Sequence, residues 1–143
     1  MTVKAILAAK GGDVVSIEPT ADLAAAAKLL TSRRIGAVVI LGAGGRLAGI
    51  LSERDIVRAL AERGSAALLL PVGQVMTRNV ATCAESDTIP SIMERMTAGK
   101  FRHMPVVEKD RVIGLVSIGD VVKSRVEQIE RESEALRDYI RTA

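Results

Sequence analysis

Two short Ser-x-x-Asp sequences, Ser52 to Asp55 and Ser117 to Asp120, carry residue types that can bind a ligand. Each follows an apolar stretch, where a strand would lead into a helix. In one interpretation the serine hydroxyl accepts a backbone N–H and the aspartate reaches back, which caps the helix. In the other, the ionised carboxylate accepts hydrogen bonds from both hydroxyls of a ribose, each worth about 1.5–3 kcal/mol. The two interpretations are compatible, because a helix N-terminus also favours an anionic ligand.

The sequence has few other side chains that could bind a metal or act in catalysis. His103 is the only histidine and Cys83 the only cysteine, so neither a metal site nor a Ser-His-Asp or Cys-His catalytic group is expected. The sequence therefore predicts that the protein is not an enzyme and has no metal and no catalytic cofactor. Cys83 is expected to be a small buried strand residue, and a single cysteine fits a reducing compartment. For His103, a strand histidine bonded to backbone and a ligand-facing role both stay open.

The glycine-rich segment 42–45 invites comparison with a phosphate-binding loop. No Gly-Lys-Ser/Thr follows it, and the next expected element is a strand instead of a helix. We interpret it as a hairpin turn.

The chain contains one unit twice. The segments that match are 49–57 with 114–122, 34–41 with 100–107, 22–33 with 88–99, and 3–7 with 72–76. Hydrophobic periodicity predicts the order β-α-β-β-α in each copy. The expected strands are 14–17, 37–41 and 47–51, then 80–83, 103–107 and 112–116; the expected helices are 22–33, 52–62, 88–98 and 118–142. The fold class is therefore α/β (α+β), with two repeats and a C-terminal helix extension.

The composition narrows the possible partners. Apolar residues make up 48% of the chain, which supports a real core, yet Phe101 and Tyr139 are its only aromatic residues. A net charge of +3 tolerates anionic ligands, but the scarcity of aromatic side chains for stacking on bases argues against a nucleic-acid partner. The apolar run at residues 5–9 is too short for a secretory signal or a membrane span, so we expect no membrane partner and a cytoplasmic location.

The last expected helix is too long for the second copy alone. An apolar seam with alternating spacings of four and three runs along it, made of Val122, Val126, Ile129, Ser133, Leu136 and Ile140. This pattern is typical of a coiled coil and predicts contact with a second subunit in a homodimer. A helix folded back on its own module is the open alternative.

The repeated Gly-x-x-Ser-x-x-Asp after an apolar strand, with segment 101–107 (Phe-Arg-His-Met-Pro-Val-Val) before the second copy, resembles the CBS domain. Two copies resemble a Bateman module, and the likeness spans nearly the whole chain. The resemblance implies two CBS repeats packed with pseudo-two-fold symmetry, at residues 1–64 and 65–125, followed by the helix extension at 126–143. It also implies two clefts between the repeats for a regulatory ligand. AMP is the first expectation, followed by ATP, ADP and NADH, with S-adenosylmethionine as a further possibility.

Carried over from the family, the aspartate of Ser-x-x-Asp would bind ribose, and the start of the middle strand would face phosphate and base. The cleft expected to be stronger would use Lys10, Asp13, Val15, Arg102, His103, Met104, Pro105, Ser117 and Asp120. The weaker cleft would use Ile35, Gly36, Ala37, Val38, Ser52, Asp55, Thr77, Arg78 and Val80. It is ranked lower because Gly36 and Ala37 replace Arg102 and His103, although Arg54, Arg58 or Arg78 could substitute.

The functional expectation is a regulatory module that transmits its ligand state to an unknown protein partner. The alternative is a dimeric scaffold whose clefts are vestigial and whose C-terminal helix makes the functional contact.

Overall fold

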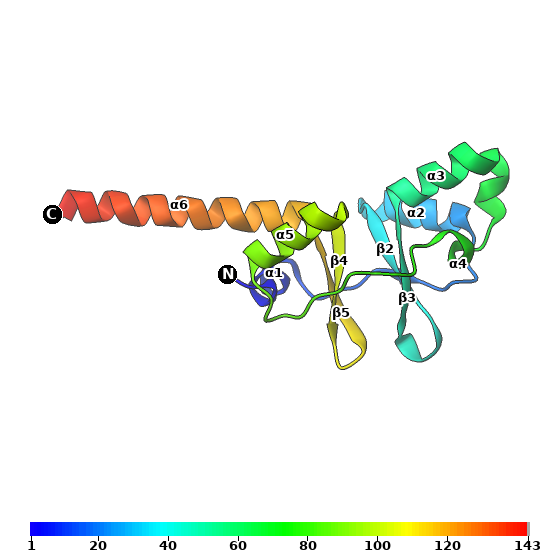
Figure 1. Ribbon diagram of the computed structural model, residues 1–143, viewed down its shortest axis with the longest axis horizontal. Coiled ribbons are helices and arrows are strands. Elements are labelled where there is room, and N and C mark those ends of the chain that lie inside the picture. Colours follow the sequence, from blue (N-terminus) through cyan, green and yellow to red (C-terminus); the bar gives the residue numbers. More distant parts are fainter. Residues whose placement is uncertain (143) are drawn as a thin grey trace.

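The computed structural model describes residues 1–142 and shows two halves side by side, with one long helix projecting away from them (Figure 1). The first half contains α2 (Leu23–Arg33), β2 (Ala37–Leu41), β3 (Leu47–Ser52) and α3 (Glu53–Arg63). The second contains α5 (Ile89–Gly99), β4 (His103–Glu108), β5 (Arg111–Ser117) and α6 (Ile118–Thr142). The two expected repeats, their pseudo-two-fold arrangement and the C-terminal helix are confirmed.

The strand pairs of the two halves have matching registers. In β2 and β3, Val39 lies opposite Ile50, and in β4 and β5 the equivalent residues are Pro105 and Leu115. Both pairs are antiparallel and both have an irregularity before the turn. The glycine-rich segment forms a short 3-10 turn, η1 (Ala43–Gly45), between β2 and β3, so the hairpin interpretation is confirmed. Gly44 and Gly45 adopt φ of 71° and 73° there, which glycine reaches without steric cost.

The strand expected at residues 80–83 is wrong as an extended element. In the first half the expected strand shortens to β1 (Ser16–Ile17), whose neighbour Val15 still accepts a hydrogen bond from the backbone N–H of Val39 at 3.2 Å. The residue that matches Val39 is Pro105, which has no N–H to donate. Only Cys83 pairs with β4 in the second half, as an isolated parallel bridge to Val106.

Helices α2 and α5, which are equivalent in the two repeats, begin in the same way. The Asp22 carboxylate accepts from the Ala25 N–H at the start of α2, and the Thr88 hydroxyl accepts from the Ser91 N–H at the start of α5. These caps satisfy donors that the first helical turn leaves unpaired. The buried faces are Leu23, Ala26 and Leu30 on α2, and Ile89, Ile92 and Met96 on α5.

The two hydrophobic cores exchange their lead-in helices, as the colours of Figure 1 show. Helix α1 (Val3–Lys10) places Val3, Ile6 and Leu7 in the core of the second half. Helix α4 (Val72–Val75) and the adjoining Met76 lie in the core of the first half, beside the 3-10 segment η2 (Gly64–Leu69). Burying each such side chain contributes roughly 1.5–3 kcal/mol, so the exchange ties the halves into one folding unit.

Candidate ligand-binding clefts

Both Ser-x-x-Asp sequences form capping boxes. In α3 the Asp55 carboxylate accepts from the Ser52 N–H at 2.9 Å, and the Asp55 N–H donates to the Ser52 hydroxyl at 3.4 Å. In α6 the corresponding distances between Ser117 and Asp120 are 2.9 and 3.1 Å. The capping interpretation is therefore confirmed for both copies. An ionised carboxylate has about four acceptor positions, so capping leaves room for a ligand hydroxyl.

Asp55 is held in place by groups around it. It is 6% exposed, its Oδ1 accepts from the Thr77 hydroxyl at 3.4 Å, and Arg58 forms an ion pair with it at 3.6 Å. Thr77 reaches this position because its backbone exchanges two hydrogen bonds with Ile50 on β3, at 2.9 and 3.0 Å. The lead-in of the second repeat thus closes the Asp55 cleft, as the sequence predicted for Thr77.

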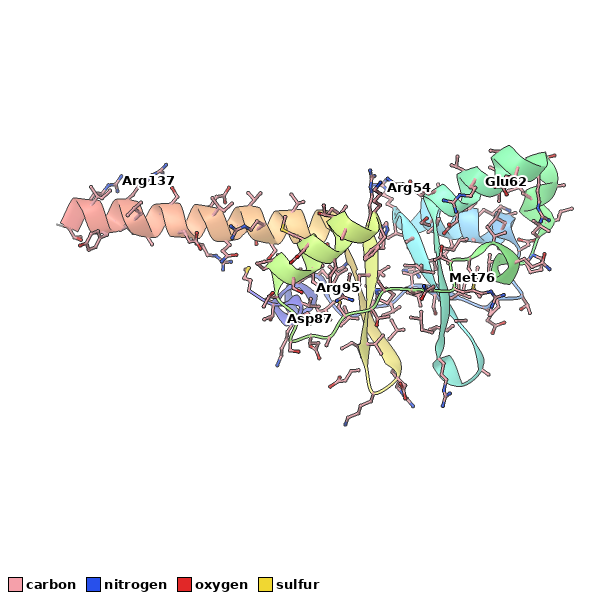
Figure 2. All side chains as sticks on the ribbon, viewed as in Figure 1. Arg54, Glu62, Met76, Asp87, Arg95 and Arg137 are labelled. Carbon is pink, nitrogen blue, oxygen red and sulfur yellow. The ribbon has the colours of Figure 1, made fainter. Side chains whose placement is uncertain are left out.

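A cavity of about 400 Å³ lies at Asp55 and is lined by residues from both halves. From the first half it is lined by Gly36, Ile50, Ser52, Glu53, Arg54, Asp55 and Arg58, with Thr77 from the lead-in; from the second half by Lys100, Phe101, Arg102, His103 and Ile118. Figure 2 shows Arg54 where the two halves meet. Four fixed cations, Arg54, Arg58, Lys100 and Arg102, therefore share one cavity with two carboxylates, Glu53 and Asp55.

Arg102 and His103 thus line the cavity of Asp55, although the sequence assigned them to the cleft of Asp120. Gly36 leaves space for His103 in this cavity. A Cβ atom at Gly36 would lie 3.2 Å from Nε2 and Cε1 of His103 and 3.2 Å from a carboxylate oxygen of Glu53. The missing side chain at Gly36, interpreted from sequence as a weakness of this cleft, admits the imidazole of His103 from the other half.

Asp120 already has a cationic partner in its own chain. The Lys10 ammonium donates to Asp120 Oδ2 at 2.7 Å and to the Leu115 carbonyl at 2.8 Å. Burial alone would raise the pKa of Asp120, but hydrogen bonds from Lys10 and Ser117 and the Lys10 charge hold it below its usual value. Lys10 does lie at the Asp120 cleft, as predicted, but there it neutralises the carboxylate that was expected to bind ribose.

A second cavity, of about 310 Å³, includes Lys10 and Asp120. Its walls come from α1 and α6, with Met1, Ala5, Ile6, Ala9, Lys123, Ser124, Glu127 and Arg131, so it opens between these helices and contains neither Arg102 nor His103. The predicted stronger set therefore lines two cavities, although His103 lies near enough to Lys10 and Asp120 for their charges to affect its pKa.

The remaining predicted residues line neither of these two cavities. Val38 and Met104 are fully buried in the two cores, and Ala37 and Pro105 are buried in the strands beside them. Val15 packs against the core of the first half, Ile35 lies between α2 and α3, and Asp13 is exposed. The Arg78 guanidinium donates to the Gly73 carbonyl at 2.9 Å, and Val80 is half-buried. Sequence reasoning missed Ile50, Glu53, Lys100, Phe101 and Ile118, each of which lies within two positions of a predicted residue in the chain.

His103 has a lowered pKa. Burial is the main cause; the nearby cations Lys10 and Arg102 lower it further, whereas Glu53 and Asp120 raise it. The imidazole is therefore neutral at pH 7, and an anionic group brought beside it would favour the protonated form.

This shift predicts that acid weakens the fold through His103. Between the unfolded value of about 6.5 and the lower folded value, the unfolded chain binds more protons, so stability falls as pH falls through that window. We expect the free energy of unfolding to drop between about pH 8 and about pH 5.5, and to drop less in His103→Gln. Urea denaturation of both proteins measures this. Equal drops in the two proteins would contradict the assignment.

The family model for the CBS domain matches residues 3–62 and again residues 72–127. The chain belongs to the CBS domain family. It is 35% identical over 119 residues to the CBS domain-containing protein CBSX3, mitochondrial, of Arabidopsis thaliana, and spans 58% of that protein and 80% of itself.

Two solved CBS structures illustrate the likeness. The CBS-domain protein ATU1752 from Agrobacterium tumefaciens is 47% identical, with a TM-score of 0.84 over 87% of this chain and 92% of that one. The CBS domain pair of MJ0100, in complex with 5′-methylthioadenosine and S-adenosyl-L-methionine, is 27% identical, with a TM-score of 0.80 over 90% of this chain and 98% of that one. Within residues 1–142 of the present chain, no helix is both long and apolar enough to cross a membrane.

Proposed function

We propose that this CBS pair is a regulatory, non-catalytic module that binds an adenine nucleotide, AMP in the first place, in the Asp55 cavity. The observation that supports it is the joining of a Ser-x-x-Asp carboxylate and four cations in one cavity between the halves. Asp55 would accept hydrogen bonds from the ribose hydroxyls, and the arginines and Lys100 would hold the phosphate. The CBS domain pair of MJ0100 was solved in complex with two adenosine compounds, which supports an adenosine-containing ligand here.

The charge of the cavity favours a phosphorylated ligand. Four fixed cations and two carboxylates leave two positive charges in excess while His103 is neutral. AMP carries a phosphate of nearly two negative charges at pH 7, since its second pKa is about 6. S-adenosylmethionine carries a sulfonium, an ammonium and a carboxylate group, so its net charge is about +1 and a cavity with excess positive charge favours it less than AMP. We therefore propose that phosphate, more than the adenosine part alone, determines affinity.

Regulation would follow from the position of the cavity between the halves. Arg102 and His103 come from the second half, and Asp55 and Arg58 from the first. A ligand that contacts both sides would favour one relative orientation of the halves, provided that its affinity differs between orientations. A protein partner that contacts both halves would sense this difference.

Calorimetry with AMP, ADP, ATP, adenosine and S-adenosylmethionine tests the proposal. We expect micromolar binding of AMP, about −8 kcal/mol, and much weaker binding of adenosine and of S-adenosylmethionine. Arg58→Gln should weaken AMP binding about tenfold, whereas Arg63→Gln, at the end of the same helix and outside the cavity, should leave it unchanged. No heat from any of these ligands with a folded protein would overturn the proposal.

A second candidate function is a scaffold with vestigial clefts, favoured by the exposed apolar side chains along α6. The same titrations separate the two functions. A folded chain that binds none of the ligands but assembles through α6 would be a scaffold.

A further inference from the structure

Helix α6 carries apolar side chains that the folded halves leave uncovered. They form the seam, which we define as Val122, Val126, Ile129, Leu136 and Ile140 together with Ser133. The five apolar residues are between 46% and 66% exposed. Leaving this much aliphatic surface in water along one line is unfavourable, and such a stripe marks an interaction surface.

The seam faces away from the rest of the protein. Val121 and Ser124 are the buried residues of α6 and mark the side that packs on the body. At 3.6 residues per turn, the direction of Val122, Val126 and Ile129 lies about 130° around the helix from that buried side. A second helix could therefore pack along the seam while the two folded bodies stay on opposite sides. Figure 1 shows that the distal part of α6 also extends well beyond the body.

The charges that flank the seam identify its occupant. In the heptad notation abcdefg, Val126 and Ser133 occupy position a, and Ile129 and Leu136 occupy position d. The residues before position a, Arg125 and Glu132, then occupy position g. The residues after position d, Glu130 and Arg137, occupy position e. In a parallel pair each g residue meets the e residue five positions later in the partner. Arg125 would then meet the partner's Glu130, and Glu132 the partner's Arg137. All of these contacts are attractive.

An antiparallel pair that aligns the whole seam has the opposite character. Lys123 would face the partner's Arg137, and Glu130 and Glu132 would each face their own copy in the partner. Like charges at these positions are destabilising. We propose that α6 pairs with α6 of a second copy of this chain in a parallel, in-register coiled coil. This inference is independent of nucleotide binding and would hold for a ligand-free chain.

A charge exchange across the seam tests the orientation. Arg137, labelled in Figure 2 on the distal part of α6, should matter through the partner's Glu132. Sedimentation equilibrium of the full chain should show that Arg137→Glu and Glu132→Arg each weaken the dimer about tenfold. The double variant should return to within about twofold of the original chain. Arg131→Glu, which makes the same charge change on the outer f position, should leave the dimer unchanged within about twofold.

Each other result overturns the proposal. A dimer strengthened by Arg137→Glu would be antiparallel along the whole seam, because the change removes repulsion from Lys123. A dimer indifferent to Arg137→Glu, or weakened by it without rescue in the double variant, would use another register or another surface. A chain that stays monomeric at its highest soluble concentration has no such dimer.

Disulfide trapping tests the parallel register independently of the charge exchange. In the parallel pair Ile140 lies beside the partner's Ile140, so Ile140→Cys should cross-link rapidly under mild oxidation, since a disulfide needs Cβ atoms about 3.5–4.5 Å apart. Asp138→Cys, on the outer face, should not. Cys83 will not compete, because burial, with a smaller effect of Asp87, raises the pKa of its thiol to about 11. Absence of the Ile140→Cys cross-link in a folded protein would overturn the parallel register.

Discussion

Replacing Asp55 with asparagine is expected to weaken AMP binding about 10- to 100-fold. The carboxylate is the acceptor we assign to the ribose hydroxyls, and each charge-assisted hydrogen bond is worth about 1.5–3 kcal/mol, or one to two powers of ten in affinity. Asparagine keeps an oxygen that can accept from the Ser52 N–H, so the helix cap survives in part. Calorimetry with AMP measures the loss, and circular dichroism shows that the fold is intact.

Asp120→Asn is the matched control, because Asp120 occupies the equivalent position in the second repeat. It should reduce AMP affinity by less than about threefold, since Lys10 already neutralises this carboxylate at 2.7 Å and a ligand there must displace the ammonium. A larger loss in Asp120→Asn than in Asp55→Asn would contradict the cavity assignment. It would instead support the ranking of the two clefts made from sequence.

The repeated elements were predictable because local signals and the repeat agree. Asp22 and Thr88 cap equivalent helices, and the strand pairs β2–β3 and β4–β5 match residue for residue. Periodicity determines which side of a helix or strand faces a core, and this information is local. The length of α6 follows from it too, since the alternating spacing of four and three continues through Ser133 to Ile140.

The cleft to which Arg102 and His103 belong could not be predicted in this way. Arg102 precedes β4 and His103 begins it, and both line the cavity that the two halves share. The absence of a side chain at Gly36 in the first half leaves space beside His103, and a local sequence pattern does not show this. Gly36, which departs from the family pattern, therefore belongs to a site that also contains residues of the second half, and only the packed structure brings these residues together.

The pairing of Lys10 with Asp120 is another contact between distant parts of the chain. The two residues are 110 positions apart and meet because α1 packs in the core of the second half. The sequence placed both at one cleft but could not show that they neutralise each other. Because α1 packs on the second half and α4 on the first, the strands also need small residues where these lead-in segments cross them.

Gly49→Ala is expected to destabilise the protein by about 2–3 kcal/mol, as overpacking in a core does. A Cβ atom at Gly49 would lie 2.7 Å from Met76 Sδ and 2.7 Å from the Thr77 carbonyl oxygen. The sulfur could move, but the carbonyl belongs to the backbone that bonds to Ile50 and carries the Thr77 hydroxyl to Asp55. Urea denaturation should show the loss, and calorimetry should show weaker AMP binding in the folded fraction.

Gly114→Ala provides the comparison, because Gly114 is the equivalent residue of the second repeat and lies against α1 instead of α4. There a Cβ atom would meet only side-chain atoms of Leu7, the nearest being Cδ2 at 2.5 Å. Leu7 can change rotamer, and alanine restricts the unfolded chain by about 0.4–1 kcal/mol, so the net loss should be about 1 kcal/mol or less. A loss in Gly114→Ala as large as that in Gly49→Ala would mean that α1 is held as rigidly against its strand as the Thr77 backbone is against β3. In that case only a rotamer change of the Lys10 side chain, which is 40% exposed, could free the Asp120 carboxylate for a ligand.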